Sequence, residues 1–386
     1  MTDTAIVEEP ELANAVRLRL GSVLDPELRK PIVDLGMVGG IAVDDDGHAN
    51  VEVRLTIVGC PAADRIESDV RSATLSVPGV SSASIDVTVM SPQERGELTS
   101  RLRGTRSRGS RFGPDSLTRV IAVTSGKGGV GKSTVTANLA VALAQRGLAV
   151  GLIDADVYGF SIPGILGIDP DATPTKVGEL MLPPVAHGVK VISIGMFLPP
   201  DQRGQAVAWR GPMLHRTIAQ FITDVFFGDL DVLLLDLPPG TGDVAISVGQ
   251  LLPNADVLVV TTPQQAAADV AERSGMVARQ TGQRVIGVIE NMAGLPQPDG
   301  SILELFGSGG GEEAARRLSE RLGTEVPVLE SIPLSVDLRR GGDAGLPVVL
   351  SDPMDPAAAA LLRLAASLAV RDGDRLAGRG LPVTPR

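Results

Sequence analysis

The chain has 386 residues, 43% of them hydrophobic and 21% charged, which is typical of a globular protein with room for a large core and a second, smaller domain. A net charge of −11 argues against a nucleic-acid binder, and a single cysteine excludes an internal disulfide framework. No apolar run approaches the roughly 20 residues that a bilayer-spanning helix needs, and the acidic N-terminal stretch lacks the apolar core of a secretory signal. We therefore expect a cytoplasmic protein that acts away from membranes and nucleic acid.

Residues 1–97 are predicted to form a small α+β domain. Apolar periodicity and turn residues predict, in order, a helix over Glu9–Val23, strands over Gly40–Val43 and Ala49–Ile57, a helix over Pro61–Leu75 and a strand over Ser82–Val89. Two segments outside the domains lack apolar periodicity: residues 98–116, where arginines alternate with glycine and serine, and residues 371–386. We expect a flexible linker and a disordered tail, respectively.

Cys60 lies where a strand gives way to a helix, one residue before Pro61. A helix N-terminus there would stabilise a thiolate and favour a functional cysteine, whereas a small residue buried at a tight turn is the other interpretation. For Asp25, Glu27 and Asp34, a role beside a metal and a role in turns or caps fit equally well.

Residues 125–134 read SGKGGVGKST and lie between an apolar, β-branched run at 119–124 and a helical pattern without proline. Strand, glycine loop and helix are the context that the phosphate-loop pattern G-x-x-x-x-G-K-[ST] requires, here met by Gly126, Gly131, Lys132 and Ser133. Glycines let main-chain amides approach a polyphosphate, and the helix N-terminus adds positive potential. We expect Lys132 to neutralise charge on the β- and γ-phosphates and the Ser133 hydroxyl to complete a magnesium shell.

Residues 117–370 are predicted to form an α/β domain with a doubly wound, mainly parallel sheet. Further strands are expected at Ala149–Ile153, Val189–Ile194, Asp231–Asp236, Asp256–Thr261, Arg284–Ile289 and Val326–Leu329. Asp154, Asp156 and Asp236 follow or end strands, where carboxylates would hold the magnesium water shell and orient the attacking water. Spacing does not separate the roles of Asp154 and Asp156. A final helix over Pro356–Val370 carries too little charge for a membrane-surface helix and is expected to pack in the core.

Lys127 adds a second lysine to the phosphate loop. This deviant form resembles the nucleotide-dependent dimerising ATPases that include septum-site, partition and nitrogenase-reductase proteins. The resemblance implies a homodimer in which Lys127 reaches the partner subunit's phosphates, Asp156 positions water, and Asp154 and Asp236 lie on the magnesium side. The phosphate-binding residues that the resemblance implies are Gly126, Lys127, Gly128, Gly129, Val130, Gly131, Lys132, Ser133 and Thr134.

Five runs narrow the resemblance to the Mrp/ApbC subfamily of iron–sulfur cluster carriers: DADVYG at 154–159, SIP at 161–163, WRGPM at 209–213, DLPPGTGD at 236–243 and ENM at 290–292. The runs DPEL at 25–28, IVDLGMV at 32–38 and TIVGCP at 56–61 resemble the small MIP18-family domain associated with iron–sulfur protein assembly. This resemblance implies that Cys60 is a candidate iron–sulfur ligand. Asn291 matches the residue that reads the adenine edge, which would select ATP, although a turn-forming Asn after a strand is the other interpretation.

The sequence departs from the carrier pattern in one interval. Cluster-carrying members place a C-x-x-C shortly after this Asn-Met, whereas residues 293–302 contain no cysteine, and His48, His187 and His215 show no ligand spacing. We therefore expect a slow ATPase that binds ATP and Mg²⁺ and delivers iron–sulfur clusters to apoproteins. An ATP-switched adaptor that presents the N-terminal domain to an assembly scaffold is the alternative, and a partition-type ATPase is disfavoured by the acidic balance.

Overall fold

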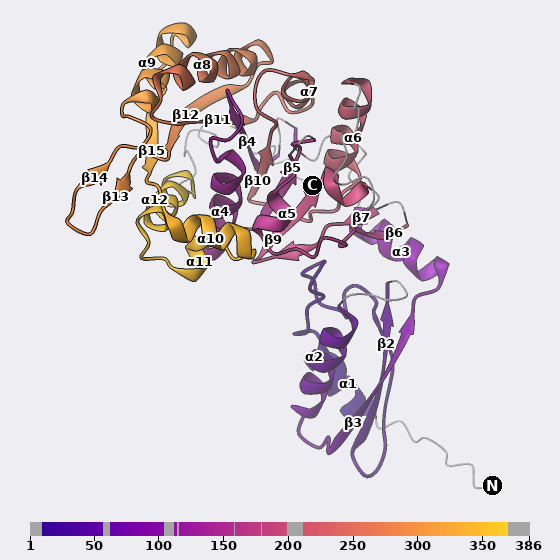
Figure 1. Ribbon diagram of the computed structural model, residues 1–386. Helices are drawn as coiled ribbons and strands as arrows, with labels where there is room; N and C mark the ends of the chain where they lie inside the picture. The colour runs from indigo at the N-terminus through magenta and orange to yellow at the C-terminus, as the bar shows by residue number, and fades with distance from the viewer. Residues whose placement is uncertain are drawn as a thin grey trace, which may run out of the picture.

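The computed structural model describes residues 10–56, 62–103, 112–113, 116–157, 159–178, 180–198 and 211–369. These residues fold around two clusters of buried apolar side chains: a small one near the N-terminus and a large one on a central sheet (Figure 1). Cys60, residues 104–111 and the predicted tail at 371–386 lie outside the described residues.

The N-terminal unit is a three-stranded sheet packed against helices. Its elements are α1 (Pro10–Leu20), β1 (Val38–Val43), β2 (His48–Leu55), α2 (Ala63–Leu75), β3 (Ser82–Val89) and α3 (Pro92–Arg103). β1 pairs antiparallel with β2, and β2 pairs parallel with β3 because α2 forms the crossover between them. Alternate residues of β2 are buried, as expected of a strand with one face on a core. The predicted order of helix, two strands, helix and strand is confirmed.

Helix α3 corrects the predicted linker. The sequence analysis ended the small domain at residue 97, yet the helix continues to Arg103. Leu98 is fully buried and Leu102 is 9% exposed, both within the small core, and the Arg101 guanidinium donates a hydrogen bond to the Asp34 carbonyl oxygen. The two leucines are spaced i and i+4, so they lie on one face of the helix. Two leucines among arginines are too short an apolar pattern to predict a helix from the sequence.

The large domain is built on an eight-stranded sheet of order β15-β12-β11-β4-β10-β5-β9-β8. The strands are β4 (Arg119–Ser125), β5 (Val150–Asp154), β8 (Val185–Ala186), β9 (Val189–Ser193), β10 (Val232–Asp236), β11 (Asp256–Thr261), β12 (Arg284–Asn291) and β15 (Val328–Ile332). All neighbours are parallel except β8 and β9. The predicted doubly wound, mainly parallel fold is confirmed, and β4 lies at its centre between β10 and β11.

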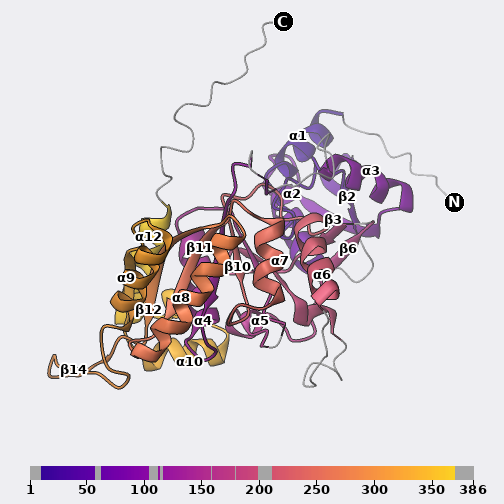
Figure 2. The same cartoon turned by 90° about the horizontal axis from the view of Figure 1, so that it is seen from above.

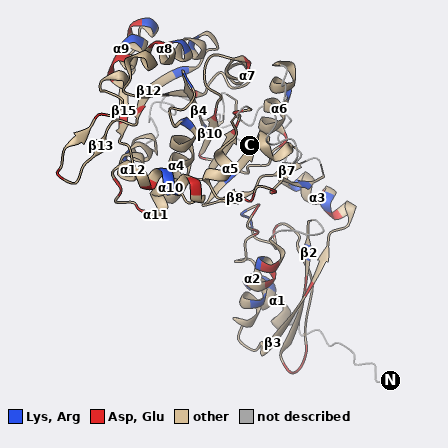
Figure 3. Cartoon of the chain, viewed as in Figure 1, with Lys and Arg blue, Asp and Glu red and all other residues tan. Residues whose placement is uncertain are grey.

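Helices cover both faces of this sheet. They are α4 (Lys132–Gln145), α5 (Ile162–Ile165), η1 (Ile194–Phe197), α6 (Gly211–Thr223), α7 (Asp243–Leu251), α8 (Gln265–Gln280), α9 (Gly310–Leu322), α10 (Val336–Ala344), α11 (Val348–Ser351) and α12 (Pro356–Ala369). Figure 1 shows α4, α10, α11 and α12 on one side of the sheet and α7, α8 and α9 on the other. Basic and acidic residues alternate along α8 and α9 (Figure 3), where Arg316 pairs with Glu313 and Arg321 with Glu272.

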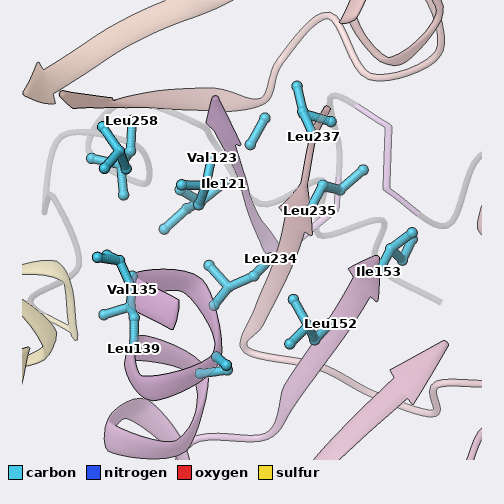
Figure 4. Close-up of a cluster of buried hydrophobic side chains, with 14 of the residues drawn as sticks. Ile121, Val123, Val135, Leu139, Leu152, Ile153, Leu234, Leu235, Leu237 and Leu258 are labelled. Carbon is cyan, nitrogen blue, oxygen red and sulfur yellow. The ribbon is translucent and has the colours of Figure 1, made fainter. Parts of the chain in front are cut away.

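Helix α4 is held by its packing against the central strands. Val135 and Leu139 of this helix lie beneath Ile121 of β4 and Leu234 of β10 (Figure 4), and the side chains of all four are at most 1% exposed. Burying a leucine or isoleucine side chain of this kind stabilises the fold by about 1.5–3 kcal/mol. The start of α4, which carries Lys132 and Ser133, is therefore fixed relative to the ends of β4 and β10.

The predicted core-packed final helix is also confirmed. Ala357, Leu361, Leu364 and Leu368 of α12 are buried, and the helix contacts α4 and β15. Arg363, on its exposed side, pairs with Glu330 of β15. In the described part of the chain, none of the helices has the length and apolar character needed to cross a bilayer.

The small unit packs directly on the large domain. The short strands β6 (Thr175–Val177) and β7 (Leu180–Leu182) form a two-stranded ladder beside α3 (Figures 1 and 2). Val177, Leu180, Leu182 and Phe226 belong to the small apolar core although they follow the nucleotide-loop segment in sequence. The core of the N-terminal unit is thus completed by side chains from the other domain.

Candidate nucleotide site

The loop between β4 and α4 is shaped by its glycines. Gly129 and Gly131 both have φ of 79°, a left-handed conformation that favours glycine, and Gly131 is the N-cap residue of α4. A Cβ at Gly126 would overlap the backbone of Val270 in α8, so this position admits only glycine without a shift of that helix. The Ser125 hydroxyl donates to the Lys127 carbonyl oxygen at 3.0 Å. The geometry matches a loop that turns its amides toward an anion at a helix N-terminus.

Lys132 and Asp236 form a buried ion pair at the base of this loop. The Lys132 Nζ lies 2.6 Å from the Asp236 Oδ2, and the side chains are 6% and 0% exposed. The Ser133 hydroxyl donates to the same Oδ2 at 2.6 Å, and the Thr136 hydroxyl donates to Oδ1 at 2.9 Å. Both oxygens of Asp236 are therefore engaged by groups from the first turns of α4. The strand-end carboxylate and the phosphate-loop residues therefore lie together at the base of the loop.

Asp154 lies next to Asp236, because the two residues are register partners at the ends of β5 and β10. Burial raises the pKa of Asp154 well above its usual value, and the charge of Asp236 raises it further. Burial also raises the pKa of Asp236, which the neighbouring Lys132 ammonium opposes. Two buried carboxylates beside a serine hydroxyl form a set of hard oxygen donors, which is the ligand chemistry that Mg²⁺ prefers. The residues present fit the magnesium ion that this class of site uses.

Asp156 occupies a different position from Asp154, which spacing alone did not resolve. It lies in the turn after β5, 7% exposed, with its Oδ2 at 3.6 Å from the Lys132 Nζ. Its Oδ1 accepts the Gly159 amide hydrogen at 3.1 Å. Asp154, by contrast, is wholly buried and accepts from the Ser193 hydroxyl. The assignment of Asp154 to the metal side and of Asp156 to water positioning is compatible with this geometry and stays a prediction.

Asn291 supports the phosphate loop from β12. Its side chain is 4% exposed, and its Nδ2 donates to the Val130 carbonyl oxygen at 2.8 Å. A Cβ at Gly131 would overlap this amide, so the loop and Asn291 are packed against each other. The side chain bonds across the domain rather than within its own turn. A role in reading the adenine edge stays a prediction.

Lys127 and Lys132 contact different elements of the domain. Its Nζ bonds the Gln264 Oε1 at 2.5 Å, and Gln264 is the exposed N-cap residue of α8. β4 and β11 are adjacent in the sheet, so the loops after them run side by side. Within this chain Lys127 is thus bonded to the start of α8.

Three residues that contact the predicted site residues were not predicted from the sequence: Thr136, Ser193 and Gln264. Thr136 could have been found, because it lies i+4 from Lys132 and therefore on the same face of α4. Ser193 and Gln264 follow strands, as the predicted aspartates do, but serine and glutamine are too common in such turns to single out. Only their contacts with Asp154 and Lys127 distinguish them.

The structure leaves the cluster ligands of the family without a counterpart in this region. Residues 293–302 form the start of a hairpin with the short strands β13 (Leu295–Pro296) and β14 (Ile302–Leu303). His48 bonds Ser82 and Ser84 in the small unit, far in sequence from His187 and His215. Among the residues that the structure describes, no group of three or more His, Cys, Asp or Glu side chains is placed to hold a metal. Cys60 lies outside those residues.

A glycine loop joins the central strand of the doubly wound sheet to a helix, and the lysine of this loop pairs with an aspartate at a strand end. This arrangement defines the class of P-loop NTPases. Comparison with known proteins narrows the class. A family model described as NUBPL iron-transfer P-loop NTPase matches residues 116–369, and one described as iron-sulfur cluster assembly protein matches residues 13–87. The chain belongs to the NUBPL iron-transfer P-loop NTPase family.

Curated relatives match over both domains. The iron-sulfur cluster carrier protein of Mycobacterium tuberculosis is 54% identical over 377 residues, which cover 97% of each chain. That of Synechocystis is 40% identical over 361 residues, covering 92% of this chain and 96% of the relative. The resemblance to iron–sulfur cluster carriers that the sequence analysis stated is confirmed.

Two solved structures support the nucleotide domain. The nucleotide-binding protein of Archaeoglobus fulgidus in complex with ADP is 36% identical, with a TM-score of 0.50, over 61% of this chain and 92% of that chain. The septum site-determining protein MinD of Pyrococcus horikoshii, complexed with Mg-ADP, is 25% identical with a TM-score of 0.50, over 67% of this chain and 98% of that chain.

Proposed function

We propose that this protein is an ATP-dependent, homodimeric carrier that binds iron–sulfur clusters and transfers them to apoproteins. The observation that carries the proposal is that one chain combines a nucleotide site with a small assembly-type domain. The chain matches a relative named iron-sulfur cluster carrier protein over 97% of that relative's length, so both parts are included in the match. We place its action in the cytoplasm, with apo iron–sulfur proteins or an assembly scaffold as partners.

The nucleotide chemistry proposed is slow hydrolysis of ATP to ADP and phosphate. The amides of residues 126–134 would hold the phosphates, and Lys132 would exchange its bond with Asp236 for the β- and γ-phosphate oxygens. Ser133, Asp154 and Asp236 would hold Mg²⁺, which when bound supplies positive charge that offsets the phosphate charge. Asp156, beside Lys132, would accept a hydrogen bond from the attacking water.

The dimer is proposed to complete the site. Lys127 bonds Gln264 of α8 rather than Asp236, and its ammonium would exchange this bond for a triphosphate on the second subunit. Closure of two subunits around two nucleotides would exclude water and add positive charge to each site. Hydrolysis would remove the γ-phosphate that Lys127 contacts and so reset the dimer.

The chain offers few cysteine ligands for holding an iron–sulfur cluster. With one cysteine per chain, a homodimer has one thiolate from each subunit, both from Cys60. The absence of cysteine from residues 293–302 favours a second candidate function, an ATP-switched adaptor whose scaffold partner supplies the cluster ligands.

Anaerobic reconstitution of the full-length protein with iron and sulfide, followed by iron and sulfide analysis and visible absorption, separates the two functions. Carriage predicts a stoichiometric cluster in the wild type that is lost in Cys60→Ala and retained in Ser84→Ala, a control in the same domain. Absence of bound iron from a wild type that still hydrolyses ATP would overturn carriage and favour the adaptor.

A further inference from the structure

Ser193 joins the nucleotide site to a neighbouring turn through one hydroxyl. It is the last residue of β9, fully buried, and the register partner of Asp154. Its Oγ donates to the Asp154 Oδ2 at 2.9 Å and accepts the Gly195 amide hydrogen at 3.2 Å, which caps the 3-10 helix η1. The Asp154 Oδ1 accepts the Asp156 amide hydrogen at 3.2 Å. Each oxygen of this carboxylate thus accepts one hydrogen bond, and the donor to Oδ2 is the N-cap residue of η1.

The 3-10 helix η1 leads to a cavity between the two domains. Met196 and Phe197 line this cavity of about 980 Å³, and Glu27 and Arg65 of the small unit line it too. Phe197 is 41% exposed and packs on Phe221 of α6, with ring centroids 5.3 Å apart. A shift of η1 would therefore change the wall that the large domain presents to the small unit.

One contact between the small unit and the large domain lies in the wall of this cavity, and two more lie outside its lining. The Thr175 hydroxyl donates to the Glu27 Oε1 at 3.2 Å, and the Thr99 hydroxyl contacts the Val177 carbonyl oxygen at 3.3 Å. The Arg29 guanidinium donates to the Gly188 carbonyl oxygen at 3.0 Å, one residue before β9 begins. β9 thus touches the small unit near one end and Asp154 at the other.

We propose that Ser193 is a positioning residue that couples the occupancy of Asp154 to the placement of η1 and, through it, to the docking of the N-terminal unit. A cation held at Asp154 with its water shell would compete with the Ser193 hydroxyl for the Oδ2 atom. If the hydroxyl lost this acceptor it would turn to another one, because an unsatisfied buried hydroxyl is costly, and its cap on Gly195 would adjust. The inference rests on the proposed nucleotide function and adds a route by which that site regulates the small domain.

Hydrogen exchange of full-length protein, read by mass spectrometry, tests the coupling without relying on turnover. Wild type, S193A, S193T and S335A are compared without nucleotide, with ATP and EDTA, and with Mg-ATP. Ser335 is the matched control, because its hydroxyl also caps a helix and donates to an aspartate, Asp355, away from the site. Fluorescence titration measures ATP binding in each variant.

The expected result is a Mg-ATP-dependent change in exchange over residues 175–182 and 194–198 in wild type, S193T and S335A. S193A should lose this change in exchange. Its ATP dissociation constant should stay within about threefold of the wild-type value, well below the tenfold difference that equals about 1.4 kcal/mol. If S193A does not fold, the wild type can still overturn the coupling, because the change in exchange must appear with Mg-ATP and be absent with ATP and EDTA.

The experiment distinguishes failure of the proposed nucleotide function from failure of the Ser193 coupling. A wild type that does not bind Mg-ATP overturns the proposed function and this inference together. A wild type that binds Mg-ATP with no change in exchange at the cavity, or an S193A protein that responds as the wild type does, overturns the coupling alone.

Discussion

The Lys132 ammonium and the Asp236 carboxylate form an ion pair of 2.6 Å in the interior of the large domain. Their side chains are 6% and 0% exposed, so neither charge is solvated by bulk water. The Asp236 carboxylate also accepts hydrogen bonds from the Ser133 and Thr136 hydroxyls. The lysine that is proposed to bind phosphate thus pairs with the carboxylate that is proposed to face magnesium.

Asp236→Asn should destabilise the fold and stop turnover. Removing one partner of a buried pair leaves the other charge uncompensated, which costs about 3–5 kcal/mol; the nearby Asp156 makes the lower end the expected value. Urea unfolding gives the loss, with the exposed Asp45→Asn as the control. An unchanged unfolding midpoint would show that Lys132 finds full compensation elsewhere.

Lys127→Ala should separate binding from hydrolysis. The Lys127 Nζ bonds Gln264 at the start of α8, so removing this side chain should leave the ATP dissociation constant of one chain within about threefold of the wild-type value. Turnover should fall at least about 100-fold. Lys132→Ala should instead weaken ATP binding and abolish turnover. Calorimetry and phosphate release measure the two quantities, and loss of ATP binding in Lys127→Ala would place that lysine on its own subunit's nucleotide.

Asn291→Ala tests the support of the phosphate loop. The change leaves the Val130 carbonyl without its side-chain donor in a buried position, so the free energy of unfolding should fall by about 1–3 kcal/mol. If Asn291 also reads the adenine edge, the preference for ATP over GTP should drop about tenfold. Thermal unfolding and competition binding measure the two effects. Gln297→Ala in the following hairpin is the control, and unchanged nucleotide preference would restrict Asn291 to the loop.

The contact between Glu27 and the large domain should depend on pH. Burial, and then the charge of Asp25, raise the pKa of Glu27 to about 7, while the Thr175 hydroxyl lowers it. Separation of the domains would return the pKa toward 4.5, so the contact is strongest below that value and weakens as pH rises through about 7. A single titrating proton limits the slope to about 1.4 kcal/mol per pH unit.

Hydrogen exchange at residues 175–182, measured from pH 5 to pH 8 and corrected for intrinsic rates, checks the Glu27 prediction. Glu27→Gln, which keeps the shape and cannot ionise, should flatten the dependence. Asp25 and Lys190 nearby, and Arg65, Lys176 and Asp171 around the cavity, are present in both proteins, so a slope that persists in Glu27→Gln would assign it to them.

Leu139→Ala should cost about 2–5 kcal/mol of stability, because its side chain is fully buried between α4 and the central strands. Leu18→Ala, at a position that is 85% exposed, should change stability by less than about 0.5 kcal/mol. Urea unfolding of both variants provides the comparison. A small loss at Leu139 would mean that α4 is anchored mainly by its polar contacts.

The sequence by itself determined the nucleotide loop, because the features that define it are local. A β-branched run, glycines at 126, 128, 129 and 131, and a helical pattern after Lys132 occur within one stretch of chain. The alternation of strands and helices then required a parallel sheet, and Asp236 at a strand end followed from that arrangement. The relation to iron–sulfur carriers likewise rested on short runs of residues.

Only the tertiary structure decided which residues meet across the fold. It assigned Asp154 to the buried pair with Asp236, separated it from Asp156, and revealed Ser193 as a partner. It also completed the small core with Val177 and Phe226, which lie far along the chain from the rest of that domain. Hydrophobic periodicity reports which face of an element is buried, but the identity of what covers that face depends on packing between segments that are distant in sequence.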